Sequence, residues 1–229
     1  MLHKCAVCKK SAEICTRLSR HGKIHPLLFA LTRPFFMACN PAATLAHGRP
    51  LPSRSRLLRH LHSGGLLAYA TESCYGLGCD PRHPGAVRRL LAVKRRPRSK
   101  GLILVSDRLS RLEAFLQKIT PEIRAGVECY WPGPVSLLLP ARAPRGLTGA
   151  HAKLAVRVTA HPDAARLCHH LQMALVSTSA NVSGARPATT EAECRRLFGA
   201  CAWVLPGKVG ARKRPSTLID YASGRVLRA

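Results

Sequence analysis

The chain is poor in acidic residues. Its 229 residues include 11 Asp and Glu against 37 Lys and Arg, which gives a formal net charge of +26. So few carboxylates argue against the paired-carboxylate chemistry of glycoside hydrolases. A positive surplus of this size favours polyanions such as RNA, DNA, nucleotides or anionic lipid, although part of it can be an ordinary solvated surface.

Long apolar runs and common nucleotide-binding fingerprints are also missing. No run reaches the ~18 residues that a membrane helix needs, and Arg33 and Pro34 interrupt the apolar segment 27–39. We therefore expect a cytoplasmic protein without a membrane anchor. The chain has no GxxxxGK[ST] motif, no GxGxxG motif after a strand and no nucleophile elbow, so the familiar nucleotide-binding and hydrolase classes are not indicated.

Residues 1–50 differ in character from the rest of the chain. They are basic, irregular and rich in Cys and His, and they run into a Pro/Ala/Gly stretch (40–52) typical of a linker. Four residues have the spacing of a two-Cys two-His zinc finger: Cys5, Cys8, His21 and His25. We expect no zinc there, because Ala12 stands where a finger has an aromatic residue and no strand pattern surrounds the cysteines.

The N-terminal extension, residues 1–50, can be interpreted in different ways. We expect residues 1–50 to be a disordered tail, or upstream sequence before a true start at Met37. A zinc-binding regulatory extension is the alternative, which metal analysis of this region would test.

From residue 51 to 229, helical and strand patterns alternate, which predicts a single α/β (α+β) domain. Apolar spacing predicts helices over 53–62, 84–94, 110–117, 122–130, 162–171 and 191–198. Strands are expected over 66–70, 102–105, 135–139, 154–158, 174–177, 203–205 and 217–220. The segment 71–80 is expected to be a turn-rich loop because it holds two glycines.

Two polar segments have the composition of a site for an anion. The segment 71–78 contains Thr71, Gly76 and Gly78, which offer a hydroxyl and close backbone approach. The segment Lys94–Gly101 carries five cations in its first seven residues, which suits phosphate or carboxylate. An ordinary loop and a solvated helix end are the alternatives.

Two further polar segments lie in or after predicted strands. Arg157 lies inside an apolar strand, where it either binds a ligand carboxylate or forms a buried structural ion pair. The segment Ser177–Gly184 offers four hydroxyls and an amide, which either hold a polar ligand or form a capping turn. Together the four segments predict a cationic, hydroxyl-rich cleft for a nucleotide or RNA, and a non-catalytic RNA-binding module, such as a ribosome-maturation factor, is one interpretation.

Six segments of the chain, in their order along the sequence, resemble motifs of the YrdC/Sua5 family in its short bacterial form. The similar segments are Thr71–Gly78, Lys94–Leu104, Trp131–Pro134, Ala155–Thr159, Ser177–Gly184 and Pro215–Thr217. The resemblance runs from about residue 53 to the end of the chain. It implies a twisted mixed sheet flanked by helices around a large basic cavity.

The activity implied by the resemblance is that of a threonylcarbamoyl-AMP synthase. Such an enzyme joins L-threonine, bicarbonate and ATP into threonylcarbamoyl-adenylate and pyrophosphate, for threonylcarbamoyladenosine in tRNA. A downstream complex transfers the group to tRNA, and the basic surface is a candidate for direct tRNA contact. Mg²⁺ is expected to accompany ATP, although the sequence offers no identifiable protein ligand for it.

The resemblance also implies roles for individual residues. The catalytic set is Lys94, Arg96, Ser179 and Asn181. The ATP-binding set is Lys94, Arg96, Arg98, Asn181, Thr189 and Arg228. The threonine-binding set is Thr71, Arg157, Ser179 and Ser216. No residue is assigned as the acceptor of the proton that the threonine amine must lose.

Overall fold

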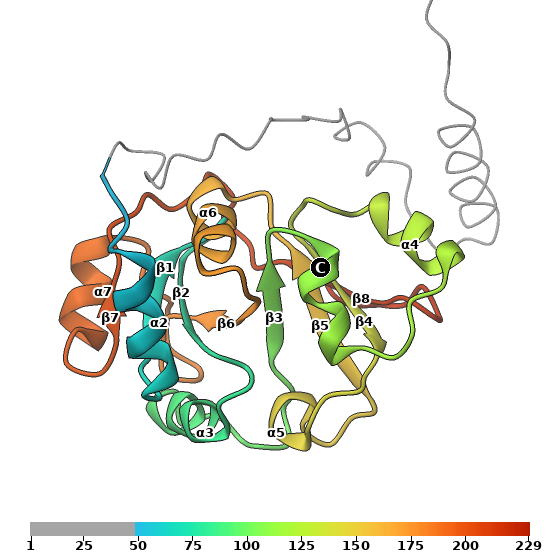
Figure 1. Ribbon diagram of the computed structural model, residues 1–229, viewed down its shortest axis with the longest axis horizontal. Coiled ribbons are helices and arrows are strands. Elements are labelled where there is room, and N and C mark those ends of the chain that lie inside the picture. Colours follow the sequence, from blue (N-terminus) through green and yellow to red (C-terminus); the bar gives the residue numbers. More distant parts are fainter. Residues whose placement is uncertain (1–48) are drawn as a thin grey trace, which may run out of the picture.

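The structure is a computed structural model, and it describes residues 49–229 (Figure 1). The Cys/His cluster and the proposed start at Met37 lie outside the described residues. No helix within the described part is long and apolar enough to cross a membrane.

One mixed sheet of nine strands forms the centre of the described region, in the order β7-β1-β2-β6-β3-β5-β4-β8-β9. Its strands are β1 (Leu67–Ala70), β2 (Tyr75–Cys79), β3 (Ile103–Ser106), β4 (Val135–Pro140), β5 (Lys153–Val158), β6 (Leu175–Ser179), β7 (Trp203–Val204), β8 (Thr217–Asp220) and β9 (Val226–Arg228). Three neighbouring pairs are parallel, namely β1–β7, β3–β5 and β4–β8, and the others are antiparallel. The mixed sheet predicted from the family resemblance is therefore confirmed.

Four of the six described α-helices begin directly after a residue whose side chain caps them. The six are α2 (Arg54–His62), α3 (Pro84–Val93), α4 (Pro121–Glu128), α5 (Arg145–Thr148), α6 (Pro162–Leu171) and α7 (Glu191–Phe198). Three of them start with proline, whose fixed φ suits the first helical position, directly after a side chain that caps a free N–H: His83, Thr120 and His161. The helices predicted over 162–171 and 191–198 have the expected bounds.

The two faces of the sheet differ in what covers them. Side chains alternate along each strand, so one face carries Leu77, Leu104 and Val156 in a continuous apolar core with α3 and α7. On the other face, α2 and α6 pack on Leu67 and Leu175 and form a second core (Figure 1). The register places four polar residues on this second face, beyond the part that α2 and α6 cover: Ser136, Arg157, Ser177 and Ser179.

The sheet is strongly curved, as a contact between segments that follow distant strands shows. In the sheet order, β1 and β5 are four steps apart, which would separate them by about 19 Å in a flat sheet. Yet the Thr159 hydroxyl, just after β5, donates a 2.7 Å hydrogen bond to Oε1 of Glu72, just after β1. Twist and curvature therefore bring the ends of these two strands together over the second face.

The structure corrects several expectations about local elements. Residues 75–79 form β2 rather than a loop. Gly78 lies against the ring of Tyr69, and an added Cβ would be 2.4 Å from the carbonyl oxygen of Val176, so the glycines allow close strand packing. The helix expected over 110–117 is a pair of 3₁₀ turns, Leu109–Arg111 and Glu113–Phe115.

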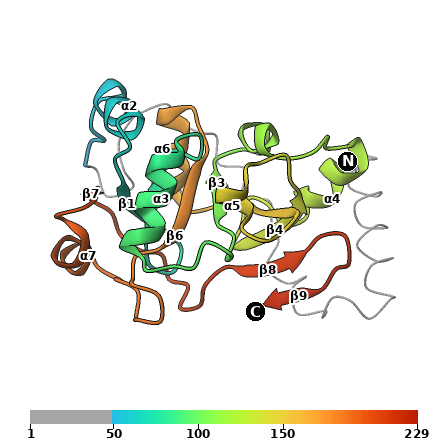
Figure 2. The same cartoon turned by 90° about the horizontal axis from the view of Figure 1, so that it is seen from below.

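Two elements were not expected at all. The short helix α5 and the edge strand β9 have too few residues for a periodic pattern. Figure 2 shows β8 and β9 as a hairpin that leads to the C-terminus of the chain. This hairpin places Arg228 on the same sheet that carries Arg157 and Ser136.

Candidate functional site

A buried ammonium group holds the polar loop that follows β6. Lys94, at the end of α3, is 2% exposed, and its Nζ donates to the carbonyl oxygens of Ser179 and Asn181, the latter at 2.8 Å. The same Nζ donates to Oδ1 of Asn181 at 3.1 Å. All three protons of the ammonium group are thus directed at this loop.

Asn181 is fixed from both ends of its side chain. Its Oδ1 also accepts a 2.6 Å hydrogen bond from the Ser179 hydroxyl, and its Nδ2 donates to the carbonyl oxygen of Ala185 at 2.7 Å. The Lys94–Ser179–Asn181 group, assembled from the end of α3 and the end of β6, is therefore one connected network.

The environment of Lys94 disfavours its charge. Burial, and then the nearby charge of Arg96, lowers the pKa of Lys94 to about 8. The ammonium form has three acceptors on the Ser179–Asn181 loop, and the loss of a proton would leave one of them without a donor.

Arg96 extends the cationic side of the site. Its Nη2 donates to the carbonyl oxygen of Gly101 at 2.8 Å, while its Nε is buried without a hydrogen-bond partner among the described residues. Burial lowers the pKa of Arg96. Arg98 is exposed and lines, with Arg96 and Arg95, a hollow of about 410 Å³ beside the end of α3.

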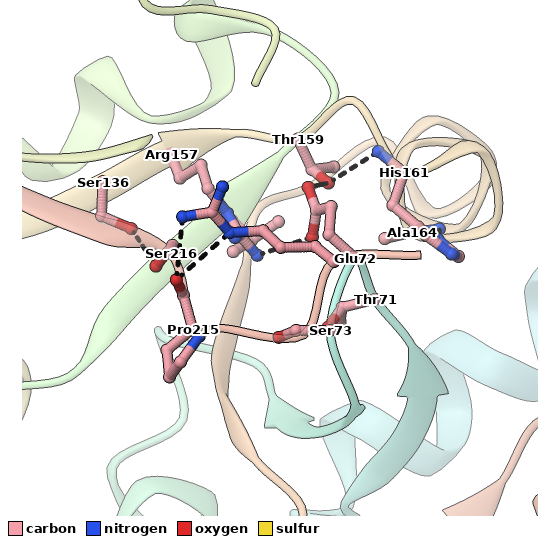
Figure 3. A network of polar contacts seen from close by, with 12 residues as sticks. Thr71, Glu72, Ser73, Ser136, Arg157, Thr159, His161, Ala164, Pro215 and Ser216 are labelled. Atoms are coloured by element: carbon pink, nitrogen blue, oxygen red, sulfur yellow. Dashed lines mark hydrogen bonds and ion pairs between the residues drawn. The ribbon is translucent and has the colours of Figure 1, made fainter. Parts of the chain in front are cut away.

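Arg157 forms an ion pair with a carboxylate that the sequence did not single out. Its Nη2 lies 3.3 Å from Oε2 of Glu72, and the two side chains are 9% and 13% exposed (Figure 3). Thr159 links this pair to α6, because it donates to Glu72 and accepts from the backbone N–H of His161 at 3.1 Å. Desolvation lowers the pKa of His161.

Two serines and the penultimate residue meet beside Arg157. The hydroxyls of Ser136 and Ser216 are 3.0 Å apart, and both residues are buried. Arg228 donates from Nε to the carbonyl oxygen of Ser216 and from Nη2 to its hydroxyl, both at 3.0 Å. Figure 3 shows Ser136 and Ser216 on one side of Arg157, with Glu72 and Thr159 on the other.

Positive charges concentrate in this part of the molecule. Burial lowers the pKa of Arg228, and the nearby charges of Arg157 and Arg96 lower it further. Guanidinium groups that repel one another across a partly buried space are stabilised by an anion between them. The arrangement can hold phosphate or carboxylate oxygens next to the hydroxyls of Ser136 and Ser216.

Two predicted site residues lie at the margins of these networks. Thr71 donates its hydroxyl to the carbonyl oxygen of Cys74 at 2.7 Å, which closes the turn that presents Glu72. Thr189 donates its hydroxyl to Glu193 at 3.1 Å, and it follows Ala188, whose N–H donates to the carbonyl oxygen of Ala180. Thr189 therefore lies beside the Ser179–Asn181 loop.

The site contains three residues that the sequence motifs did not indicate: Glu72, Ser136 and Thr159. A signal for Glu72 was available, because an arginine inside an apolar strand needs a buried acid and the chain has only 11 acidic residues. Ser136 gave no such signal, since one serine in an apolar strand is ordinary. Among residues 49–229, no group of three or more His, Cys, Asp or Glu residues is arranged to hold a metal ion.

Comparison with known proteins links this site to one family. The sequence model of the Sua5/YciO/YrdC family, described as Telomere recombination, matches residues 59–229. Threonylcarbamoyl-AMP synthase of Thiobacillus denitrificans is 55% identical over 172 residues, which cover 74% of this chain and 92% of the relative. The protein of the same name from Methylobacillus flagellatus is 51% identical over 178 residues, covering 76% of this chain and 99% of the relative.

A solved structure supports the same relationship. The crystal structure of P. abyssi Sua5 complexed with L-threonine superposes with a TM-score of 0.67 at 30% identity. The match covers 74% of this chain and 51% of that protein.

Proposed function

Because the chain belongs to the Sua5/YciO/YrdC family, we propose that it is a threonylcarbamoyl-AMP synthase, a nucleotidyltransferase of tRNA modification. It forms threonylcarbamoyl-adenylate and pyrophosphate from L-threonine, bicarbonate and ATP. The relatives' names favour this enzyme over the non-catalytic RNA-binding module. We assign the catalytic domain to residues 51–229, and the family match over 59–229 supports this assignment.

One electrostatic observation carries the proposal at the level of the site. Arg96, Arg157 and Arg228 come from three separate parts of the chain, and the nearby charges of Arg157 and Arg96 add to burial in lowering the pKa of Arg228. Arg228 donates to the Ser216 hydroxyl, and the charge of Arg96 acts on Lys94. A triphosphate and an amino-acid carboxylate are the anions that such a cluster would hold together.

The threonine side of the site consists of Arg157 and neighbouring hydroxyls. Arg157 would pair with the carboxylate, because its Nε has no hydrogen-bond partner among the described residues. Thr71, Ser179 and Ser216 would contact the amine, the carbamate or the side-chain hydroxyl.

The nucleotide side consists of the cationic loop after α3 and the loop after β6. Arg96 and Arg98 would bind phosphate oxygens, and Arg228 would close over them. Asn181 and Thr189 would bind the nucleotide next to them. Lys94 would act on the phosphates partly through the loop that it holds, since its ammonium group already has three acceptors.

The chemistry proceeds in two steps. The threonine amine attacks bicarbonate to form a carbamate with loss of water, and a carbamate oxygen then attacks the α-phosphate of ATP and expels pyrophosphate. Negative charge accumulates on the phosphates during the second step, so fixed cations lower its barrier. The held network of Lys94, Ser179 and Asn181 also orients the reactants, which reduces the entropic cost of bringing them together.

Mg²⁺ would enter with the phosphates of ATP rather than in a cage of protein carboxylates. The described residues contain no group of three or more potential metal ligands, so no residue is assigned to it. The large basic cavity, contact with tRNA and delivery to a downstream transfer complex belong to the same proposal.

Pyrophosphate release tests the proposal directly. The full-length protein should release pyrophosphate from ATP only when both L-threonine and bicarbonate are present. Equal release without threonine would refute the assignment. The product should be an adenylate whose carbon label comes from bicarbonate, as mass spectrometry would show.

A further inference from the structure

The ion pair between Glu72 and Arg157 is incompletely satisfied. Oε2 of Glu72 and Nε of Arg157 are both buried and without a hydrogen-bond partner among the described residues. The contact between the two side chains is a single 3.3 Å approach of Nη2 to Oε2. Leaving a buried charged group without hydrogen bonds is costly, so such a pair calls for additional partners.

The surrounding structure holds Glu72 in place and leaves Oε2 without a hydrogen-bond donor among the described residues. Thr159 donates to Oε1 at 2.7 Å and thereby fixes one oxygen of the carboxylate. The backbone of the turn is fixed by Gly210, whose N–H donates to the carbonyl oxygen of Thr71, and by Arg212, whose N–H donates to that of Glu72. A side chain fixed at one oxygen with the other unsatisfied is oriented for a further donor.

Two other ionisable groups of this region are already committed to the protein. The three protons of the Lys94 ammonium group have acceptors in the Ser179–Asn181 loop. Both ring nitrogens of His161 are used, Nε2 with the carbonyl oxygen of Lys208 at 3.1 Å and Nδ1 with the N–H of Ala164. Neither group is therefore free to contact the amine of a substrate.

The Glu72–Arg157 pair has the charge pattern of an α-amino acid in reverse. An amino-acid zwitterion carries an ammonium and a carboxylate on one carbon atom, about as close together as the two protein groups. When it binds, its ammonium group can partly replace Arg157 as the partner of Glu72. Its carboxylate can likewise partly replace Glu72 as the partner of Arg157. No buried charge is left unpaired during this exchange, which keeps its cost low.

We propose that Glu72 binds the ammonium group of the amino-acid substrate while Arg157 binds its carboxylate. Glu72 thereby makes the enzyme specific for a free α-amino group. This inference rests on the proposed function for the identity of the amino acid, L-threonine. It adds a carboxylate to a threonine site otherwise assembled from hydroxyls and one guanidinium.

Calorimetric titration without ATP tests this role independently of turnover. The ligands are L-threonine and its analogue in which a hydroxyl replaces the amine. The proteins are the wild type, Glu72→Gln and the matched control Glu113→Gln. Glu113 also pairs with an arginine, Arg124 at 2.7 Å, but lies outside the site.

The expected result is selective for the ammonium group. The wild type should bind L-threonine at least about tenfold more tightly than the analogue. Glu72→Gln keeps an acceptor for Thr159 and should weaken L-threonine binding by about 10- to 100-fold, with a change of less than about threefold for the analogue. Glu113→Gln should bind both ligands as the wild type does.

Two outcomes would overturn the proposal. If Glu72→Gln weakens both ligands equally, Glu72 acts only by orienting Arg157. If the wild type binds both ligands equally, the ammonium group is not recognised, and this comparison decides the question even if the variant does not fold. A wild type that discriminates between the ligands but releases no threonine-dependent pyrophosphate would refute the proposed function and leave this inference standing.

Discussion

Replacement of Lys94 by methionine removes the ammonium group and keeps most of the side-chain volume. In the structure Lys94 is 2% exposed, and its ammonium group donates to three acceptors, two on Asn181 and one on Ser179. The substitution therefore leaves two carbonyl oxygens and one amide oxygen without this donor. It also removes the cost of burying a charge. In the wild type this cost is visible in the pKa of Lys94, which is lowered to about 8, mainly by burial.

The magnitude follows from these opposing effects. Each unsatisfied buried acceptor costs ~1–3 kcal/mol, but water can reach part of the loop and the desolvation of the charge is relieved. We expect a net decrease of about 1–3 kcal/mol in the free energy of unfolding, which corresponds to a fall in Tm of roughly 2–12 °C. Turnover should fall by at least about 100-fold, since fixed electrostatic groups contribute on this scale.

Two measurements on the same preparation separate stability from activity. Urea denaturation gives the free energy of unfolding, and threonine-dependent pyrophosphate release gives kcat/KM. Lys118→Met is the control, because Lys118 is exposed and should change neither quantity appreciably. If Lys94→Met keeps kcat/KM within about threefold of the wild type while remaining folded, the Lys94 ammonium group is not needed to hold the site.

Three further outcomes follow from the same geometry. The kcat/KM for ATP should fall as pH rises through about 8, because Lys94 then loses the proton that serves its third acceptor; a flat profile over roughly pH 6–10 would contradict this. Asn181→Ala should reduce pyrophosphate release at least about 100-fold and leave the circular dichroism spectrum unchanged, whereas wild-type turnover would remove Asn181 from the site. Gly78→Ala places a Cβ 2.4 Å from the carbonyl oxygen of Val176 and should destabilise the fold by ~1–3 kcal/mol in urea denaturation. The control Gly146→Ala, whose Cβ would meet nothing closer than 3.8 Å, should be neutral or slightly stabilising.

The sequence predicted the elements that have local signals. Pro162 follows a capping histidine, and Thr190 caps α7 before Gly199 ends it, so both helices could be bounded from neighbouring residues alone. The segment containing Gly76 and Gly78 was misread as a loop for the same reason. Glycine is a local turn signal, and its actual role here is to let Tyr69 pack across a neighbouring strand.

The site was predictable in composition but not in its contacts. The motifs located Lys94, Asn181 and Arg157, and the two interpretations of Arg157 followed from the cost of burying a charge. No local rule could pair Arg157 with Glu72, because the contact depends on the curvature of the whole sheet. Local rules also could not show that the Lys94 ammonium group is directed at the protein backbone. That contact depends on where β6 ends relative to α3.

The order of the strands has a consequence for how the protein is made. β2 pairs with β6, about a hundred positions later in the chain, and β1 pairs with β7 later still. When β1 and β2 leave the ribosome, each therefore lacks one of its two final neighbours. β2 waits for β6, and β1 waits for β7. The site, which takes Glu72 from the β1–β2 turn and Arg228 from β9, can assemble only after residue 228 has emerged. During that interval the unpaired edges of the β1–β2 hairpin can pair with other chains, so this hairpin depends on protection from aggregation.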